Sequence, residues 1–170
     1  MNLKPKTYNL KSNSGFTIVE FLIQTGLLAI FLVILTDLLV SIIEVKLNSE
    51  TISSVEEDGR FIIARMNYDI HRASSVTAPA TLGAASTSLV LVIGGSNYTY
   101  QLNGSNLELT DPLGTGRLNG SEAGVSGLSF QRLGNFGGKP TVKIQFSVNS
   151  VENSLRAARS KTFVSTGGLR

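Results

Sequence analysis

The sequence predicts an α+β fold, in which one long N-terminal α-helix packs on a C-terminal antiparallel β-sheet. Helical patterns run without proline from residue 16 to Pro79. Beyond Pro79, short β-prone runs alternate with turns rich in Gly, Asn and Ser. The chain length of 170 residues suits about one domain of this kind.

The composition excludes several kinds of functional site. The chain has no cysteine, so disulfides, thiolate zinc sites, iron–sulfur clusters and cysteine nucleophiles are excluded. His71 is the one histidine, which excludes metal sites built from several imidazoles. We therefore expect neither a metal nor a cofactor.

The excess of basic residues lies at the N-terminus. The formal net charge is +3 and the pI is near 9.3. Lys4, Lys6 and Lys11 account for this excess, because no acidic residue precedes residue 16. From residue 16 onward basic and acidic residues are equal in number, so the net charge does not indicate an acidic partner for the rest of the chain.

Residues 16–36 form an apolar run, FTIVEFLIQTGLLAIFLVILT, in which Glu20 is the one charged residue. A helix of this length is about 31 Å long, close to the hydrocarbon thickness of a lipid bilayer. The run therefore predicts a single membrane span. Basic residues precede it and mixed to acidic residues follow it, so the N-terminus is expected in the cytoplasm and the chain after about residue 45 outside.

Two alternatives explain the apolar run differently. A secretory signal peptide would end in a small-x-small cleavage site, but residues 36–40 read TDLLV and offer none. A plain uncleaved anchor leaves two residues unexplained. Glu20 is ionisable and lies within the apolar run, where a charge is costly without a partner. Gly15 lies at the junction, where glycine lets a protease hold the backbone extended.

Residues 11–20, KSNSGFTIVE, strongly resemble the type IV prepilin motif, a short basic leader that ends in Gly and is followed by Phe, Thr, two aliphatic residues and Glu. The resemblance implies that a membrane-embedded prepilin peptidase cleaves between Gly15 and Phe16 and methylates the new amino group of Phe16. It also implies that other pilins or minor pilins and an inner-membrane assembly platform are partners. Residues 1–15 would be the leader, and residues 16–40 the transmembrane and polymerisation helix.

Thr17 and Glu20 belong to the same motif and are assigned to filament assembly. Cleavage would leave an ammonium group on Phe16, and the Glu20 carboxylate of one subunit would neutralise the amine of its neighbour. Such a pair adds little net stability, whereas either charge left unpaired is expensive, so the pair would fix the register of assembly. The alternative is that Glu20 snorkels to the membrane interface, since it lies within about one and a half turns of the helix start.

Residues 41–76 are expected to form the amphipathic half of the same helix. A stripe at helical spacing would pack on the globular domain: Ile52, Val55, Gly59, Ile62, Met66 and Ile70. Gly59 marks either a local break or close packing. The opposite face carries charges: Glu56, Glu57, Arg60, Arg65, Asp69 and Arg72. Asp69 is spaced to pair with Arg65 and Arg72, and His71 is expected to be solvated.

Residues 56–61 and 69–73 are similar to the segment that follows the anchor in minor pilins and J-type minor pseudopilins. Asp37 stands where major pilins usually carry proline, and the chain lacks the cysteines of their C-terminal disulfide. The tip subunit of a secretion pseudopilus usually lacks the corresponding Glu, whereas this chain has Glu20. The resemblance therefore favours a minor subunit just below the tip.

Residues 77–170 are expected to form a globular antiparallel β domain. We expect strands at 88–93, 98–102, 107–110, 128–133 and 141–148, and an edge strand at 162–165. Residues 103–106, NGSN, predict a hairpin turn, and 134–140 predict a second turn. The Gly-rich stretch 111–124 is expected to be a long loop.

The β domain carries no recognisable catalytic motif. It has no G-x-S-x-G, no phosphate loop and no convincing carboxylate pair, so we expect no enzymatic activity. Four basic residues near the C-terminus could contact DNA phosphates: Arg156, Arg159, Lys161 and Arg170. The alternative is a solvated basic patch, because no aromatic residues are interleaved to stack bases.

The expected function is that of a minor pilin-like structural subunit, which joins or primes a type IV pilus or pseudopilus through its N-terminal helix. It would reside in the cell membrane and, after assembly, in an extracellular filament. One alternative is a single-span membrane anchor that carries an extracellular binding domain. Another is a pseudopilus component that serves secretion or DNA uptake.

Overall fold

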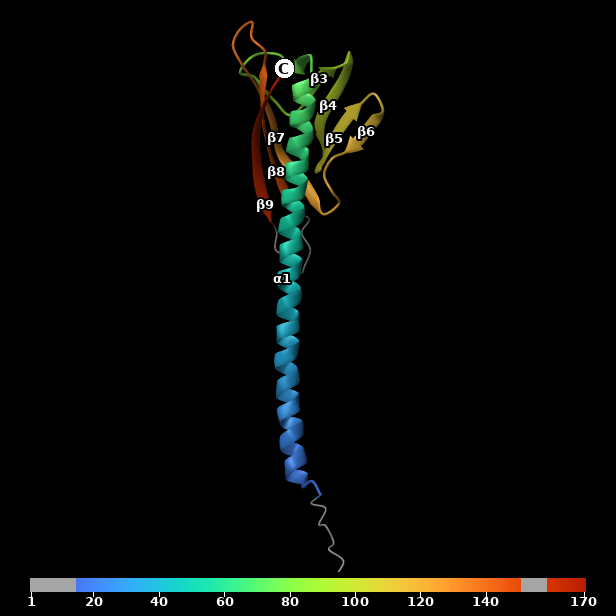
Figure 1. The fold of residues 1–170 in the computed structure, drawn as a ribbon, viewed down its shortest axis with the longest axis vertical. Coiled ribbons are helices and arrows are strands. Elements are labelled where there is room, and N and C mark those ends of the chain that lie inside the picture. Colours follow the sequence, from blue (N-terminus) through green and yellow to red (C-terminus); the bar gives the residue numbers. More distant parts are fainter. Residues whose placement is uncertain (1–14, 151–158) are drawn as a thin grey trace, which may run out of the picture. The chain divides into compact units, whose positions relative to one another are not determined.

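The structure is a computed structural model that describes residues 15–150 and 159–170 (Figure 1). Residues 1–14 of the expected leader and Arg156 lie outside the described residues. The helix α1 spans Ile18–Arg72. The strands of the described ranges are β1 (Ser75–Ala78), β2 (Ala85–Ser86), β3 (Leu89–Ile93), β4 (Ser96–Asn103), β5 (Asn106–Asp111), β6 (Gly114–Arg117), β7 (Ala123–Leu133), β8 (Thr141–Ser150) and β9 (Ser160–Gly168). The chain divides into two compact units, Met1–Ile43 and Glu44–Arg170, which are described in turn.

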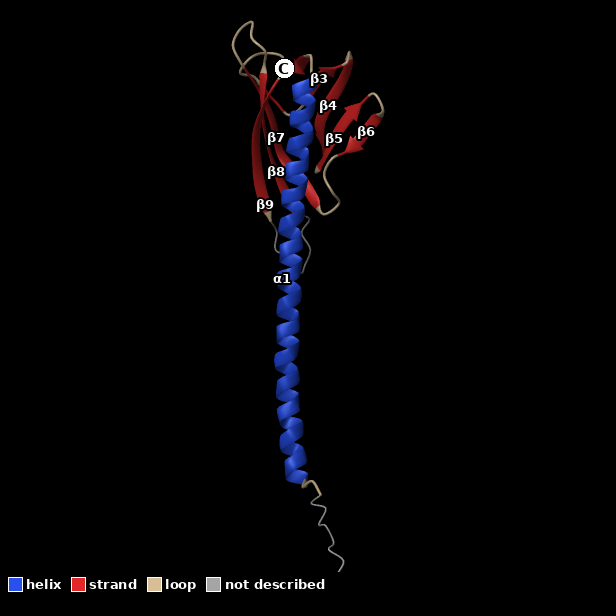
Figure 2. Ribbon diagram, viewed as in Figure 1, coloured by secondary structure: helices blue, strands red, loops and turns tan. Residues whose placement is uncertain are grey.

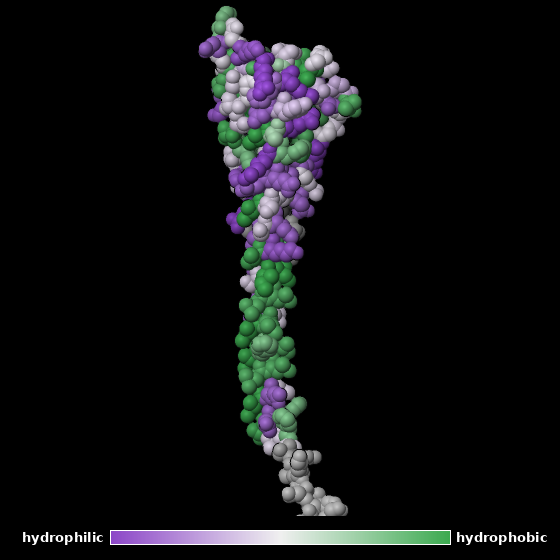
Figure 3. Space-filling model, in the orientation of Figure 1, coloured by the Kyte–Doolittle hydropathy of each residue, from purple (hydrophilic) through white to green (hydrophobic). Residues whose placement is uncertain are grey.

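The described part of the first unit is the apolar beginning of α1. Its large apolar side chains are all exposed, from 43% at Leu35 to 81% at Ile18. The segment is rich in Leu and contains no proline, which suits a helix interior. Apolar residues dominate its visible surface (Figure 3). The helix to which it belongs is long and apolar enough to cross a membrane.

The second unit confirms the predicted α+β fold, with the C-terminal part of α1 packed on antiparallel strands (Figure 2). The strands form two sheets, whereas one was expected. The first sheet has the order β1-β3-β4-β5-β6 and the second the order β2-β7-β8-β9. Residues 118–122 carry the chain from the edge of the first sheet to the second, and the part of α1 that belongs to this unit lies in front of both sheets (Figure 1).

The predicted apolar stripe of the helix forms much of the core. Val55, Ile62, Met66 and Ile70 are all buried. They pack with residues from both sheets, including Leu89, Leu91, Tyr100, Leu107, Phe130, Ile144 and Phe146. Burial of this contiguous apolar surface is the main favourable term in folding of the unit.

The prediction for Ile52 is wrong, because this residue is 43% exposed. It lines an open pocket with Ser160 and Lys161, where β9 begins and the sheet no longer covers the helix. Thr51 is buried in its place. The Thr51 hydroxyl donates to the Leu47 carbonyl oxygen at 2.8 Å, so its burial leaves no unpaired donor.

Gly59 marks close packing and not a helix break. A Cβ atom at this position would overlap the ring of Phe163 on β9, well inside the 3.0 Å that real Cβ atoms keep. The Phe163 ring stacks on Phe146 of β8, with ring centroids 5.6 Å apart. The absence of a side chain at Gly59 therefore lets α1 approach the second sheet.

The helix ends at Arg72 and not near residue 76. The Ser74 amide donates to the Val92 carbonyl oxygen at 2.8 Å, and β1 then pairs with β3. Residues 74–77, SSVT, are poor helix formers and suit a strand better. The change from helix to strand thus comes from pairing with β3, which the expectation based on Pro79 did not include.

The strands β3, β4 and β5, the hairpin turn between β4 and β5, and the edge strand β9 are confirmed. The expectation of a long loop at 111–124 is wrong in part. β6 pairs with β5, Asp111 opposite Gly114, and β7 begins at Ala123. The Asp111 side chain accepts from the Leu113 amide at 2.9 Å and closes the turn.

Candidate functional site

The expected processing site lies at the accessible start of the described chain. Gly15 is exposed, and nothing lies within 4 Å of where its Cβ atom would be. Phe16 is 71% exposed, and both residues precede the first turn of α1. A protease needs an unobstructed peptide, and both residues of the Gly15–Phe16 bond are exposed in this structure.

Thr17 and Glu20 are brought together as a helix cap. The Thr17 Oγ1 atom accepts a hydrogen bond from the Glu20 amide at 3.2 Å, and the Phe21 amide donates to the Thr17 carbonyl oxygen at 3.1 Å. Thr17 is therefore the N-cap and Glu20 the third helical residue. The order Thr-x-x-Glu before an apolar run is a capping-box signature, a signal in the sequence that the expectations above did not use.

The same position favours the Glu20 carboxylate electrostatically. The N-terminus of a helix carries a partial positive charge from its unpaired amides, and Glu20 lies in the first turn. An acidic residue there is stabilised even before it meets a partner. Glu20 therefore lies three residues after the N-cap Thr17, at the end of the helix that favours a negative charge.

Two threonine hydroxyls in the apolar helix form hydrogen bonds with backbone carbonyl oxygens one turn earlier in the same helix. Thr25 donates to the Phe21 carbonyl oxygen at 3.0 Å, and Thr36 donates to the Leu32 carbonyl oxygen at 2.8 Å. Hydroxyls that bond to the preceding turn suit an environment without water. These contacts agree with a helix that leaves water for lipid or for other apolar helices.

Comparison of the chain with protein-family models, with curated proteins and with solved structures gave no match.

Asp69 was expected on the face opposite the apolar stripe, and this expectation is wrong, because Asp69 is fully buried. The two expected ion pairs do form, with Arg65 Nε 3.0 Å from Asp69 Oδ2 and Arg72 Nη2 2.9 Å from Asp69 Oδ1. Tyr100 of β4 donates to Asp69 Oδ2 at 2.5 Å. Burial raises the pKa of Tyr100, and the hydrogen bond to Asp69 raises it further, so the phenol stays a donor.

A second group of contacts ties the helix to the connection between the sheets. The Asp58 carboxylate accepts from the Gly120 amide at 2.7 Å. Buried Asn119 accepts from the Leu107 amide at 2.8 Å and donates to the Ala123 carbonyl oxygen at 2.6 Å. Asp58 therefore holds α1 to the connection between the sheets, and Asn119 holds that connection to β5 and β7.

The basic C-terminal residues do not form one patch. Lys161 pairs with Glu56 of α1, Nζ to Oε1 at 2.7 Å, and Arg159 is exposed beside the beginning of β9. Arg170 lies beyond the other end of this strand, and a strand of nine residues is about 30 Å long. Arg156 lies outside the described residues, so DNA contact by Arg156, Arg159 and Lys161 stays a prediction.

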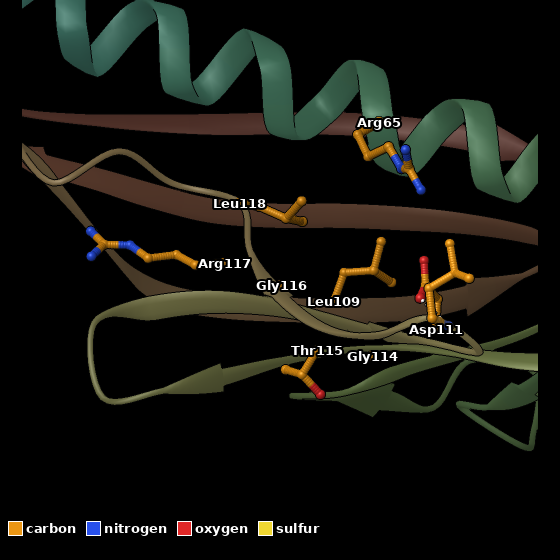
Figure 4. Close-up of a pocket in the computed structure, with 9 residues that line it drawn as sticks. Arg65, Leu109, Asp111, Gly114, Thr115, Gly116, Arg117 and Leu118 are labelled. Carbon is orange, nitrogen blue, oxygen red and sulfur yellow. Dashed lines mark hydrogen bonds between the residues drawn. The ribbon is translucent and has the colours of Figure 1, made fainter.

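The pocket between α1 and the edge of the first sheet has a volume of about 310 Å³. Arg65 reaches toward it from the helix, while Leu109 and Leu118 line it from the strand side and Arg117 points away (Figure 4). Arg65 is already bonded to Asp69. Asp111 lines the same pocket from the strand side (Figure 4), and the pocket is an open groove on the surface.

Polar chemistry elsewhere in the described ranges is equally sparse. His71 is exposed as expected, and its Nδ1 atom donates to the Gly168 carbonyl oxygen at 2.7 Å. Among residues 15–150 and 159–170, no group of three or more His, Cys, Asp or Glu side chains is placed to hold a metal ion. The candidate functional site is therefore the N-terminal segment, Gly15 to Glu20, together with the apolar helix behind it.

Proposed function

We propose that this protein is a minor pilin-like structural subunit and not an enzyme. Prepilin peptidase removes the leader between Gly15 and Phe16 and methylates the Phe16 amine. The mature chain then joins or primes a type IV pilus or pseudopilus through its N-terminal helix. Other pilins and the inner-membrane assembly platform are its partners in this process.

The observation that carries the proposal is an accessible Gly-Phe junction directly before a capped helix whose apolar beginning is exposed. Phe16 is 71% exposed, and Thr17 caps the helix that follows. Exposed apolar side chains on this scale must leave water, either in a bilayer or among other helices. The same apolar helix surface would contact lipid while the subunit is stored in the membrane, and would contact other helices once the subunit is in a filament.

Glu20 supplies the register of assembly in this proposal. In a filament, the carboxylate of one subunit neutralises the Phe16 amine of its neighbour, and each charge satisfies the other away from water. Any other axial offset leaves both charges unpaired at a large cost. The N-terminal cap supports this role, because it fixes Glu20 within the first helical turn.

The proposed location follows from charge and hydropathy. The basic leader stays in the cytoplasm, the apolar segment spans the membrane, and the unit Glu44–Arg170 lies outside. After assembly this unit forms part of an extracellular filament. Asp37 and the lack of cysteine support a minor subunit over a major one.

The proposal is tested by mass spectrometry of the N-terminal peptide, with the protein expressed in a host that has an active prepilin peptidase. We expect a chain that begins at N-methylated Phe16, and a matched Gly15→Leu variant that retains its leader. A wild-type chain that still begins at Met1 contradicts the proposal. That result favours a single-span anchor whose external domain binds a ligand, with the groove beside Arg65 as the place to search.

A further inference from the structure

The end of the unit Glu44–Arg170 at which α1 stops carries a projecting loop. Residues 134–140, GNFGGKP, join β7 to β8 and stand out from this end of the sheets (Figure 1). A second loop, residues 79–84, lies beside the end of β7, because the Gly83 amide donates to the Arg132 carbonyl oxygen at 2.7 Å. These two loops together are called the loop surface below.

The apolar side chains of the loop surface are uncovered. Phe136 is fully exposed, and Leu82 is 41% exposed. Both residues line a groove of about 440 Å³, whose wall also includes Arg132. Hydrophobic and strongly hydrophilic side chains stand next to each other on the projecting loop (Figure 3). A single exposed apolar residue is ordinary in itself, and what distinguishes Phe136 is the charge around it.

The side-chain charges on the loop surface and on the strand ends beside it are positive. Lys139 is exposed on the projecting loop, Arg132 lies just before this loop and Lys143 just after it. No Asp or Glu occurs in residues 70–107 or 123–150. In the part of the chain that the structure describes, none of the three cations forms an ion pair. Their charges are therefore available to an anionic partner.

Two further groups near this end leave the positive charge in place. Asp69, near the end of α1, is fully buried and already paired with Arg65 and Arg72. The Arg132 Nη1 atom donates to backbone carbonyl oxygens, among them that of Ala80 at 2.7 Å. Carbonyl oxygens hold the guanidinium group without cancelling its charge. The loop surface therefore combines net positive charge with an exposed apolar ring.

An anionic lipid bilayer has both of the matching properties. Lys and Arg side chains are attracted to acidic headgroups, and an aromatic ring is stabilised at the boundary between headgroups and acyl chains. Gly137 and Gly138 follow Phe136 and carry no side chain, so the ring can enter this boundary ahead of the rest of the loop. Single-stranded nucleic acid fits less well, because it is bound by several stacked rings and Phe136 is the one aromatic residue of the two loops.

We propose that the loop surface binds an anionic lipid bilayer. The Phe136 ring inserts at the boundary between headgroups and acyl chains, and Lys139 and Lys143 lie beside the lipid phosphates. This contact goes beyond the proposed function and does not depend on it, because it uses none of the residues from Gly15 to Ile43. The chain then meets lipid through two separate surfaces, the apolar helix and the loop surface.

A tryptophan placed in the loop reports on this contact, since the natural sequence contains no tryptophan. The full chain is first held in nanodiscs of phosphatidylcholine, which accommodate its apolar helix, and vesicles are then added. Phe136→Trp places the reporter on the loop surface. Leu113→Trp is the matched control, because Leu113 is 97% exposed in the turn between β5 and β6.

We expect the emission of the Phe136→Trp variant to move to shorter wavelength with vesicles that contain phosphatidylglycerol, and to stay unchanged with vesicles of phosphatidylcholine alone. The emission of the Leu113→Trp variant should stay unchanged with both. No shift of the Phe136→Trp variant overturns the inference. So does an equal shift with both kinds of vesicle, or an equal shift of both variants.

Cosedimentation of the nanodiscs with phosphatidylglycerol vesicles measures the strength of binding. Phe136→Ala should weaken binding about tenfold, because it removes the inserted ring. Lys139→Glu should also weaken binding about tenfold, because it reverses a charge near the headgroups. Arg159→Glu makes the same change of charge beside the beginning of β9 and should leave binding almost unchanged. Equal effects of the two charge reversals contradict the proposed orientation and overturn the inference.

A single-stranded DNA oligonucleotide is the competing probe for the same surface. We expect it to bind the nanodiscs more weakly than the anionic vesicles do. If the oligonucleotide binds in a way that Lys139→Glu abolishes, while the vesicles do not bind, the surface belongs to nucleic acid and the lipid contact is ruled out.

Discussion

Phe163 fills the space beside Gly59 that any other residue would need for its Cβ atom. We predict that Gly59→Ala lowers the free energy of unfolding by about 1–3 kcal/mol, a usual cost of overpacking a core. The Phe163 ring cannot move aside freely, because it stacks on Phe146. Denaturant unfolding of the full chain in detergent measures the change.

Gly116→Ala is the matched control for this substitution. Nothing lies within 4 Å of a Cβ atom at Gly116, and the residue is on the exposed edge strand β6. Its unfolding midpoint should stay close to that of the wild type. Equal stability of the Gly59→Ala variant and the wild type would show that β9 does not pack closely on α1.

Asp69→Asn should be among the most destabilising single substitutions in the unit Glu44–Arg170. It leaves Arg65 and Arg72 without their shared carboxylate, and breaking a buried charge pair costs about 3–5 kcal/mol. Tyr100→Phe removes only the phenol donor and should cost about 1–3 kcal/mol, because it leaves one acceptor less satisfied. Chemical denaturation of both variants gives the order, and a smaller effect for Asp69→Asn would contradict it.

The Glu56–Lys161 pair should make the attachment of β9 dependent on pH. The hydrogen bond from Lys161 lowers the pKa of Glu56 below its ordinary value of 4.5. A lowered pKa in the folded state means that the pair stabilises the fold above that value, and that this stabilisation is lost as the pH falls below it. The stability difference between wild type and Glu56→Gln, measured by thermal unfolding, should therefore shrink on acidification and in high salt.

Thr17→Ala should loosen the start of the apolar helix, because the Glu20 amide loses its acceptor. Loss of an N-cap typically costs about 1 kcal/mol, and Thr17→Ser should restore most of it. Hydrogen exchange of the amides in the first turn, measured in micelles, reports the effect. Similar protection in the alanine and serine variants would show that the cap adds nothing.

Glu20→Ala should leave the protein inserted in the membrane but impair its incorporation into filaments, since the Phe16 amine of a neighbour would have no carboxylate. Glu20→Gln is the conservative control and should also fail, because it keeps the shape and removes the charge. Sheared filament preparations and membrane fractions are compared by immunoblotting. Normal amounts of the alanine variant in the filaments would rule out the proposed role of Glu20.

The helix and most strands were predictable because their signals are local. The spacing of Val55, Ile62 and Met66 alone indicates a helix face that packs on a core. The burial of Asp69 was not predictable in this way, because its donor Tyr100 comes from a strand distant in sequence. Strand β6 was missed for another reason: its residues are all exposed and Gly-rich, so they show no alternation of apolar and polar residues.

The candidate site was predictable from its motif, and its geometry only in part. The junction of Gly15 and Phe16 and the charge of Glu20 are visible in the sequence. The separation of Lys161 from Arg170 could not be predicted from the sequence, because it depends on the extended strand that lies between these two residues. The pairing of Lys161 with Glu56 likewise depends on how α1 crosses β9.

Strand β9 follows every other described strand in the chain, yet it contacts the helix that comes before all of them. Its Lys161 pairs with Glu56 across 105 residues of sequence, and its Phe163 lies against Gly59. The ribosome makes α1 first, so the second sheet lacks its edge strand until β9 has been synthesised. Contacts between such distant segments form slowly, because the intervening chain must be ordered before they contribute. During synthesis, the growing chain therefore carries an uncovered part of its core, which a chaperone or a neighbouring chain can reach.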